Sequence, residues 1–209
     1  SYISGKTFGA EDVAANLPRI AKSLRNLHAL EPFDHEFNMF NTQSNYFKIV
    51  KDQGFRVPDG YVDFEPMVAQ IKKAFEVLFE GLVPCNNDLL PGNFIDDGKK
   101  IWLIDYEYSG NNDACFEIGN VWAEAFQPIE ALEELVTAYY GAHRPDKVAR
   151  AWLWALMAKY GWTLWAAIQA SVSDIDFDFR AWGGEKFDLA QSQFTSERFK
   201  KALVEVVTK

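Results

Sequence analysis

Apolar residues recur at intervals of three and four along much of the chain, the spacing that places side chains on one face of a helix. Between residues 11 and 30, for example, Val13, Leu17, Ile20, Leu24 and Leu27 follow this spacing. The pattern predicts helices over 11–30, 45–51, 65–79, 115–126, 129–140, 145–171 and 185–207.

A different pattern interrupts the helices near the middle of the chain. Two short apolar runs, 93–95 and 101–104, flank the tetrapeptide Asp96-Asp97-Gly98-Lys99, which is typical of a tight turn. We therefore expect a β-hairpin here. The predicted fold is mainly α with one small β-hairpin, an α+β fold, and a chain of 209 residues favours one domain over two.

The composition limits the class of protein. Hydrophobic residues make up 48% of the chain and charged residues 24%, which are globular values and exclude disorder as the main state. Thirty acidic against 21 basic side chains give a formal charge of −9, so we expect no nucleic-acid partner and a mild attraction for small cations. The most apolar region, 151–172, is interrupted by polar residues such as Lys159, which predicts a buried helix and no integral membrane segment.

The two cysteines bear on the location of the protein. Cys85 and Cys115 cannot form a disulfide scaffold, and a reducing, cytoplasmic compartment is therefore expected. Cys85 is expected to be a small buried side chain.

Polar residues gather at one end of the predicted hairpin. Asp88 and Asn93 precede its first strand, Asp105 follows its second, and folding of the hairpin brings these segments together. Carboxylate and amide oxygens are suitable ligands for Mg²⁺. An Asp, an Asn five residues later and a strand-terminal Asp also follow one another in kinase catalytic loops. The alternative is that Asp88 and Asn93 are turn residues and Asp105 is a cap, but their placement around two strands favours an ion site.

Four segments, in order, resemble the choline and ethanolamine kinase family. Residues 83–94 resemble its H-N-D-x₃-G-N loop, and residues 103–109 its I-D-F-E-Y-S segment. Residues 116–120 are similar to F-D-I-G-N, and residues 160–165 to W-G-L-W. The likeness spans about residues 1–190, and Leu27-His28 also resembles the end of an early helix in the wider aminoglycoside-phosphotransferase-like group.

The resemblance implies a protein-kinase-like fold. Residues 9–209 would form its helical C-terminal lobe, with the catalytic hairpin at 82–108, and residues 1–8 would be the linker from an N-terminal lobe that is absent from this chain. No glycine-rich phosphate loop and no lysine strand of the kinase type occurs in the 209 residues.

The same resemblance implies an activity: ATP-dependent phosphorylation of the hydroxyl group of a small cationic amino alcohol, with choline placed first and ATP and Mg²⁺ as co-substrate and cofactor. It implies Asp88 as the catalytic residue that positions or deprotonates the acceptor, and Asn93, Asp105 and Glu107 as ion ligands. The implied substrate-binding residues are Tyr108, Glu124, Trp162, Trp165, Phe177 and Trp182, and the implied nucleotide-binding residues are Tyr2 and Ile3.

Two departures from the family pattern keep alternatives open. Asn86 stands where the family usually has His, which bears on the rigidity of the loop, and Glu117 stands where it usually has Asp, which bears on a supporting hydrogen bond. The missing lobe and Asn86 support a second hypothesis, a non-catalytic lobe that binds a cationic ligand or a protein partner. Thiamine and aminoglycoside kinases are alternatives within the same reaction, and a homodimer is compatible with the sequence.

Single side chains also have simpler interpretations. His28, near the end of the first predicted helix, is expected to be a packed, hydrogen-bonded histidine. Trp162 and Trp165 lie three residues apart and so share a helical face, which is also the arrangement of ordinary core residues.

Overall fold

Helices carry most of the chain in the computed structural model, which describes residues 3–208. The chain divides into two units, and each is described by itself. The first unit holds residues up to 37 and 79–155, and the second holds residues 38–78 and 156–207. The prediction of a mainly helical fold with a small hairpin is confirmed.

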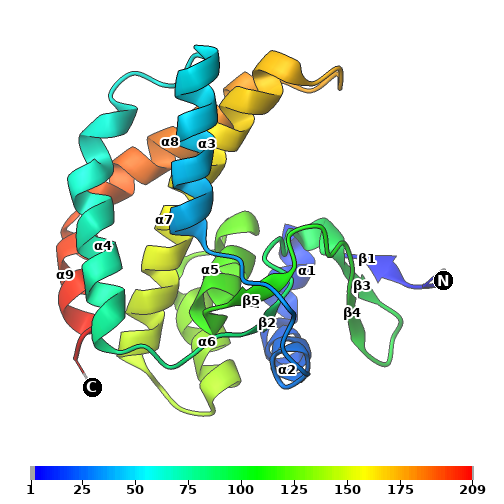
Figure 1. The fold of residues 1–209 in the computed structure, drawn as a ribbon. Coiled ribbons are helices and arrows are strands. Elements are labelled where there is room, and N and C mark those ends of the chain that lie inside the picture. Colours follow the sequence, from blue (N-terminus) through cyan, green and yellow to red (C-terminus); the bar gives the residue numbers. More distant parts are fainter. Residues whose placement is uncertain (1–2, 209) are drawn as a thin grey trace. The chain divides into compact units, whose positions relative to one another are not determined.

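The hairpin lies in the first unit, where it belongs to a three-stranded antiparallel sheet with the order β1-β3-β4 (Figure 1). The strands are β1 (Lys6–Thr7), β3 (Phe94–Asp96) and β4 (Ile101–Leu103). Phe94 pairs with Leu103, and the turn closes with a hydrogen bond from Asp97 N to Lys100 O of 3.2 Å. A Cβ atom at Gly5 would lie 2.5 Å from the Asp96 carbonyl oxygen, so only glycine allows this close approach to β3.

A second sheet in the same unit was not expected from the sequence. It joins β2 (Val83–Cys85) and β5 (Gly110–Asn112) in antiparallel fashion, with Cys85 opposite Gly110. Its strands have three residues each and contain proline, glycine or asparagine, so no alternating pattern marks them.

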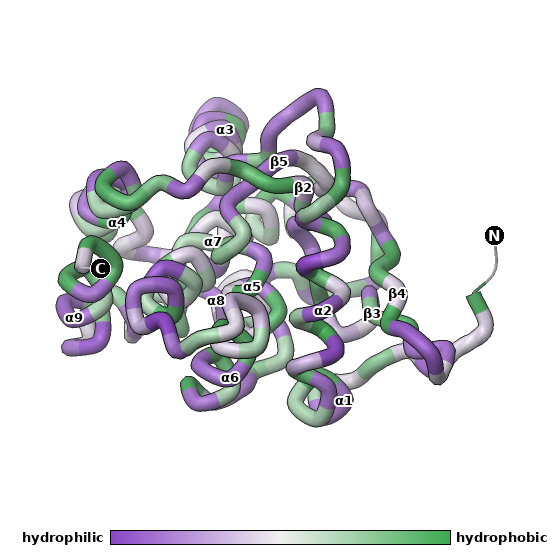
Figure 2. Tube along the Cα trace, turned by 90° about the horizontal axis from the view of Figure 1, so that it is seen from below, coloured by the Kyte–Doolittle hydropathy of each residue, from purple (hydrophilic) through white to green (hydrophobic). Residues whose placement is uncertain are grey.

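The predicted first helix is wrong as a single element. Two helices, α1 (Ala10–Ala15) and α2 (Leu17–His28), meet at Asn16, whose backbone leaves the helical conformation. Pro18 lies in the first turn of α2, where a missing N–H has no helical partner to lose. The buried residues of α2 still follow the predicted spacing, and Figure 2 shows polar and apolar residues alternating along its tube.

Three further helices of the first unit agree with the sequence pattern. They are α5 (Ala114–Glu124), α6 (Ile129–Tyr140) and the first part of α7 (Pro145–Val172), whose residues 145–155 belong to this unit. The short 3₁₀ helix η2 (Pro91–Asn93) precedes β3. The apolar face of α2 packs against α6, and full burial of each leucine or isoleucine contributes about 1.5–3 kcal/mol.

The second unit contains the remaining helices: α3 (Met39–Gln53), the 3₁₀ helix η1 (Tyr61–Phe64), α4 (Glu65–Val77), the rest of α7, α8 (Phe179–Phe194) and α9 (Glu197–Glu205). The helix α3 begins earlier than predicted because the Asn38 side chain accepts hydrogen bonds from the first turn. The predicted last helix, 185–207, is wrong as one element. It starts at Phe179 and breaks at Thr195, and Ser196 caps α9, which lies beside α4 (Figure 1).

Stacked aromatic rings form the core of the second unit. The rings of Tyr61 and Tyr160 are parallel, with centroids 4.1 Å apart. Each hydroxyl donates to the backbone carbonyl of the other residue, at 2.9 and 2.7 Å, so both buried polar groups are satisfied. Phe64 and Phe194 stack on each other, with centroids 5.1 Å apart, and Phe194 meets the Tyr160 ring edge-on.

Within residues 3–208, no helix combines the length and apolar character needed to cross a lipid bilayer.

Candidate functional site

The loop that follows β2 folds around the carbonyl group of Asp88. The Asn93 side chain donates from Nδ2 to Asp88 O at 2.7 Å, and Leu90 N donates to the same oxygen at 3.0 Å. Asp88 and Asn93 are both half-buried, and these bonds hold them next to one another. The five-residue spacing between Asp88 and Asn93 therefore corresponds to one tight loop, which brings the two residues together.

Asp105 follows β4 and joins this loop at the same end of the hairpin. Ile104 N donates to Asn93 O at 3.0 Å, and the Asn86 side chain donates to Ile104 O and Asp105 O at 3.1 and 2.7 Å. Asp105 has a φ of +58°, a conformation that a non-glycine residue rarely adopts, so its backbone turns sharply here. The predicted convergence of the segments that carry Asp88, Asn93 and Asp105 is confirmed.

Asn93, Asp105 and Glu107 offer oxygen atoms of the kinds that bind a hard divalent cation. The Asn93 amide nitrogen donates to the Asp88 carbonyl. No residue in the described range donates to the amide oxygen, Oδ1, which can therefore bind a ligand. Asp105 and Glu107 are exposed, and their carboxylates accept no hydrogen bond from residues 3–208. One amide oxygen and two carboxylates are the oxygen ligands that Mg²⁺ prefers.

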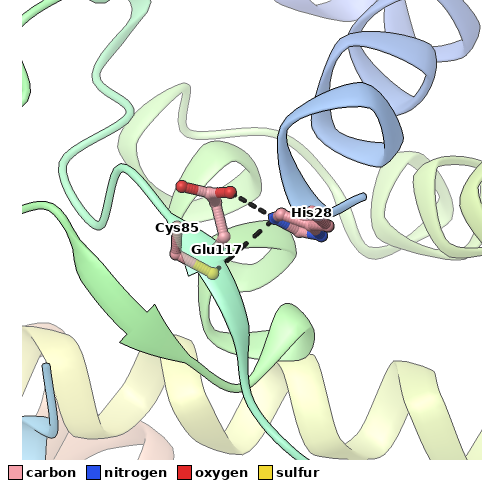
Figure 3. Close-up of side chains that lie close together, drawn as sticks. All are labelled: His28, Cys85 and Glu117. Atoms are coloured by element: carbon pink, nitrogen blue, oxygen red, sulfur yellow. Dashed lines mark hydrogen bonds and ion pairs between the residues drawn. The ribbon is translucent and has the colours of Figure 1, made fainter. Parts of the chain in front are cut away.

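A buried carboxylate supports the loop from below. Glu117 of α5 accepts hydrogen bonds at Oε1 from the backbone nitrogens of Asn86 and Asn87, at 2.5 and 3.1 Å. At Oε2 it accepts from His28 Nε2 at 2.5 Å, as Figure 3 shows. The other ring nitrogen of His28 lies 2.7 Å from the Tyr139 hydroxyl. His28 is thus a packed, hydrogen-bonded histidine, as predicted.

Cys85 completes this buried cluster. Its Sγ lies 3.6 Å from His28 Nε2, and the ligand-type atoms of Cys85, His28 and Glu117 all lie within 4.8 Å of one another (Figure 3). Burial raises the pKa of the Cys85 thiol well above its usual value, so it remains protonated and donates to Asn112 O. Both Glu117 oxygens already accept hydrogen bonds. We interpret the cluster as internal support for the loop, not as a metal site.

Four of the predicted substrate-binding rings lie in the second unit. The Trp165 ring contacts Trp162 and Trp182, with centroids 6.4 and 5.7 Å away. Phe179, which the sequence did not single out, links Trp165 to Phe177 at 5.6 and 4.9 Å. The only local signal for Phe179 is the alternation of Asp and Phe over residues 176–179.

These rings differ in what they can offer a ligand. Trp162 is buried, which agrees with a core role, whereas Trp165 and Trp182 are half-buried and Phe177 is exposed. The ammonium group of Lys186 lies 4.5 Å from the Trp182 ring centroid. That face of Trp182 therefore already carries a cation of the protein itself.

The remaining residues predicted to bind substrate or nucleotide belong to the first unit. Tyr108 is half-buried, with its ring edge-on to Phe37 at 6.4 Å, and Glu124 is half-buried at the end of α5. Ile3 is half-buried in an irregular segment before β1. Tyr2 lies outside the described residues.

A separate hollow of about 440 Å³ lies in the first unit, between α2 and β4. Its rim is basic, with Lys22, Lys99 and Lys100, and its lining includes Trp102 and Tyr106. None of the predicted site residues lines it.

Comparisons with known proteins agree on one family. The family model described as choline/ethanolamine kinase matches residues 1–134. Ethanolamine kinase 2 of Homo sapiens is 32% identical over 176 residues, which cover 72% of this chain and 45% of that protein. Ethanolamine kinase 2 of Mus musculus is 30% identical over 217 residues, which cover 90% of this chain and 56% of that protein.

Solved structures give the same result. A choline/ethanolamine kinase family protein from Mesorhizobium loti matches with a TM-score of 0.91 and 29% identity, over 99% of this chain and 73% of that chain. The choline kinase LicA from Streptococcus pneumoniae matches in fold, with a TM-score of 0.80 and 21% identity, over 93% of this chain and 68% of that chain. The chain spans about half the length of the curated relatives it matches.

Proposed function

Because the chain belongs to the choline/ethanolamine kinase family, we propose that the protein transfers the γ-phosphoryl group of ATP to the hydroxyl group of a small cationic amino alcohol. The observation that supports this most directly is the arrangement of the Asp88 loop and Asp105. One tight loop and one strand end bring the segments of Asp88, Asn93 and Asp105 to the same end of the hairpin, which supports the roles proposed for them.

In this proposal Asp88 is the catalytic residue. Its carboxylate orients the acceptor hydroxyl and takes its proton as the oxygen attacks the γ-phosphorus, and the bond from that phosphorus to the bridging oxygen of ADP breaks. Asn93, Asp105 and Glu107 would hold Mg²⁺, which offsets the negative charge of the phosphates when bound. The protein's own contribution is to fix these oxygens before substrate arrives.

The acceptor that we propose first is choline. A quaternary ammonium donates no hydrogen bonds, so ring faces and a carboxylate are what can recognise it. The half-buried Trp165 and the exposed Phe177 offer such faces, and Tyr108, Trp162, Trp182 and Glu124 are proposed to contribute to acceptor binding. The human and mouse relatives are named ethanolamine kinases, so ethanolamine is the acceptor to compare.

Nucleotide binding is proposed for Tyr2 and Ile3, by resemblance to the segment that leaves the N-terminal lobe in this family. We further propose that the chain corresponds to the C-terminal lobe, with the rest of the nucleotide site formed by an N-terminal lobe of the protein. The length of the curated relatives supports this division.

The test is a coupled ADP-release assay of the full-length protein with choline, ethanolamine, thiamine and kanamycin. We expect turnover with an amino alcohol. Asp88→Asn should lower kcat by about 10²–10⁴-fold, since the acceptor hydroxyl loses its proton acceptor, while ATP binding is nearly unchanged. Asp105→Ala should instead abolish Mg·ATP binding in calorimetry.

The outcomes separate the alternatives. Turnover only with thiamine or kanamycin would keep the reaction and replace the acceptor. Near-normal turnover of Asp88→Asn would show that this loop is not catalytic. Absence of turnover with every acceptor, together with binding of choline, would leave a non-catalytic ligand-binding protein.

A further inference from the structure

We propose that Asn86 is a positioning residue that locks the Asp88 loop to the Asp105 segment. The proposal rests on the proposed function for its catalytic meaning. Asn86 stands where the resembled family usually has a histidine, and its side-chain contacts in this chain are those of an amide.

Three hydrogen bonds from one side chain carry the argument. Oδ1 of Asn86 accepts from the backbone nitrogen of Asp88 at 3.0 Å. Nδ2 donates to Ile104 O at 3.1 Å and to Asp105 O at 2.7 Å. The Asn86 side chain therefore contacts the backbone of both the proposed catalytic residue, Asp88, and the proposed ion ligand, Asp105, which lie 17 residues apart in the sequence.

The chemistry of an amide suits this place. Asparagine has one oxygen that accepts and two N–H groups that donate, whereas a neutral imidazole has one acceptor and one donor. All three capacities of Asn86 are used, and the residue is fully buried. Replacing either end of the amide would leave a buried backbone group without its partner, which is costly.

The bond to Asp105 meets a local demand of the backbone. Asp105 has a φ of +58°, in the left-handed region that disfavours residues with a Cβ atom. Such a conformation persists only where surrounding contacts hold it. Two hydrogen bonds to consecutive carbonyls, at Ile104 and Asp105, are contacts of this kind.

Asn86 is itself held in place by the buried carboxylate of Glu117. Its backbone nitrogen donates to Glu117, and Glu117 is bonded to His28. The neighbouring Asn87 has a different role, since its side chain donates to Tyr108 O and Gly110 O and accepts from Asn112. Asn87 therefore joins the loop to the segment around β5, whereas Asn86 joins the loop to the Asp105 segment.

The experiment compares Asn86→Ala, Asn86→Asp and Asn86→His in the full-length protein. We expect Asn86→Ala and Asn86→Asp to lower kcat and to raise the Mg²⁺ concentration for half-maximal rate, each by about 10–100-fold, as for lost supports of metal ligands. The KM for the amino alcohol should change by less than about threefold, because no acceptor contact is removed. Asn86→His should recover part of both losses, since an imidazole can restore two of the three bonds.

Asn111→Ala is the matched control. Asn111 is also an asparagine with two bonds to backbone, from Nδ2 to Phe33 O at 2.8 Å and at Oδ1 from Phe33 N at 2.9 Å, but it touches neither Asp88 nor Asp105. It should cost stability without a change in Mg²⁺ dependence. Wild-type kcat and Mg²⁺ dependence in Asn86→Ala, or equal effects of Asn86→Ala and Asn111→Ala on Mg²⁺ dependence, would overturn the proposal.

A readout that needs no turnover separates this proposal from the proposed function. Amide hydrogen exchange should accelerate at both 86–90 and 104–107 in Asn86→Ala, and Mn²⁺ binding followed by electron paramagnetic resonance should weaken. In Asn111→Ala the faster exchange should be confined to 31–37 and 109–112. If the wild type phosphorylates no acceptor but these exchange results hold, the kinase assignment fails and the positioning role stands. Unchanged exchange at 104–107 in Asn86→Ala overturns the positioning role whatever the activity.

Discussion

Glu117 is the buried acceptor that connects the backbone of the Asp88 loop to His28. One carboxylate accepts hydrogen bonds from two backbone nitrogens of the loop and from His28, and His28 in turn contacts Tyr139. With the imidazole proton on Nε2, the Tyr139 hydroxyl donates to Nδ1 and every group in the chain of bonds has a partner. Burial raises the pKa of Tyr139, which keeps this donor protonated.

The consequence at the residue scale is a graded loss of stability. Glu117→Ala should destabilise the protein by about 3–5 kcal/mol, because it leaves two buried backbone N–H groups and the Nε2–H group of His28 without their acceptor. Tyr139→Phe removes only the outermost hydroxyl and should cost about 1 kcal/mol. Urea unfolding of both variants checks the order. Equal losses would mean that the carboxylate contributes no more than an ordinary packing contact.

At the scale of elements, the turn of the β3–β4 hairpin is stabilised by hydrogen bonds to one side chain, that of Asp97. Asp97 accepts hydrogen bonds from the backbone nitrogens of Lys100 and Lys99 and from Trp102 Nε1, at 2.9, 2.8 and 2.7 Å. These donors, the Lys100 nitrogen first, lower the pKa of Asp97 to about 2. The ammonium group of Lys100 also lies over the Trp102 ring, 3.2 Å from its centroid. The turn between β3 and β4 is therefore held by one ionised carboxylate.

The stability that Asp97 provides should depend on pH in a defined direction. Because its pKa is lower in the folded state, the contribution is fully present above the ordinary pKa of an aspartate, about 3.9, and is lost as the pH falls toward about 2. The melting temperature of Asp97→Ala should lie below that of the wild type at neutral pH, and the gap should narrow below about pH 4. Thermal scans of both proteins from neutral to acid pH measure it, and a gap that stays constant would contradict the assignment.

At the scale of the whole molecule, the proposed activity leads to a comparison of two acceptors, choline and ethanolamine. Loss of one desolvated ring that contacts a quaternary ammonium costs about 0.5–2 kcal/mol, which is roughly a 2- to 30-fold loss of affinity. Ethanolamine carries a primary ammonium with hydrogen-bond donors and should depend more on a carboxylate. We therefore expect Trp165→Ala to raise the choline KM more than the ethanolamine KM, and Glu124→Gln to do the reverse.

Steady-state kinetics of both variants with both acceptors make this comparison. Trp154→Phe is the companion variant, because Trp154 is buried against Phe116 and has no proposed role in acceptor binding, so its exchange should alter stability more than either KM. Equal changes for both acceptors in Trp165→Ala and Glu124→Gln would assign the tryptophans to the core and remove the physical basis for choline.

The sequence by itself determined the elements whose signals are local. The helices α4 to α7 and the hairpin lie where the periodicity and the turn residues predict them, because apolar spacing and turn chemistry act over a few residues. The order of Asp88, Asn93 and Asp105 around two strands was enough to predict their convergence, since a hairpin returns the chain to its starting end.

Tertiary structure alone decided the features that join distant residues. The two breaks at Asn16 and Thr195 interrupt patterns that read as continuous helices. The strands β2 and β5 exist only through pairing with each other. The resemblance linked the position of Glu117 to a supporting hydrogen bond, but its contact with His28 could not be predicted, because the two residues lie 89 residues apart and nothing in their local sequence shows that they meet. The Asn86 side chain, which as a sequence departure put the rigidity of the loop in question, makes three hydrogen bonds, because the fold places two donors and one acceptor where carbonyls and an N–H converge.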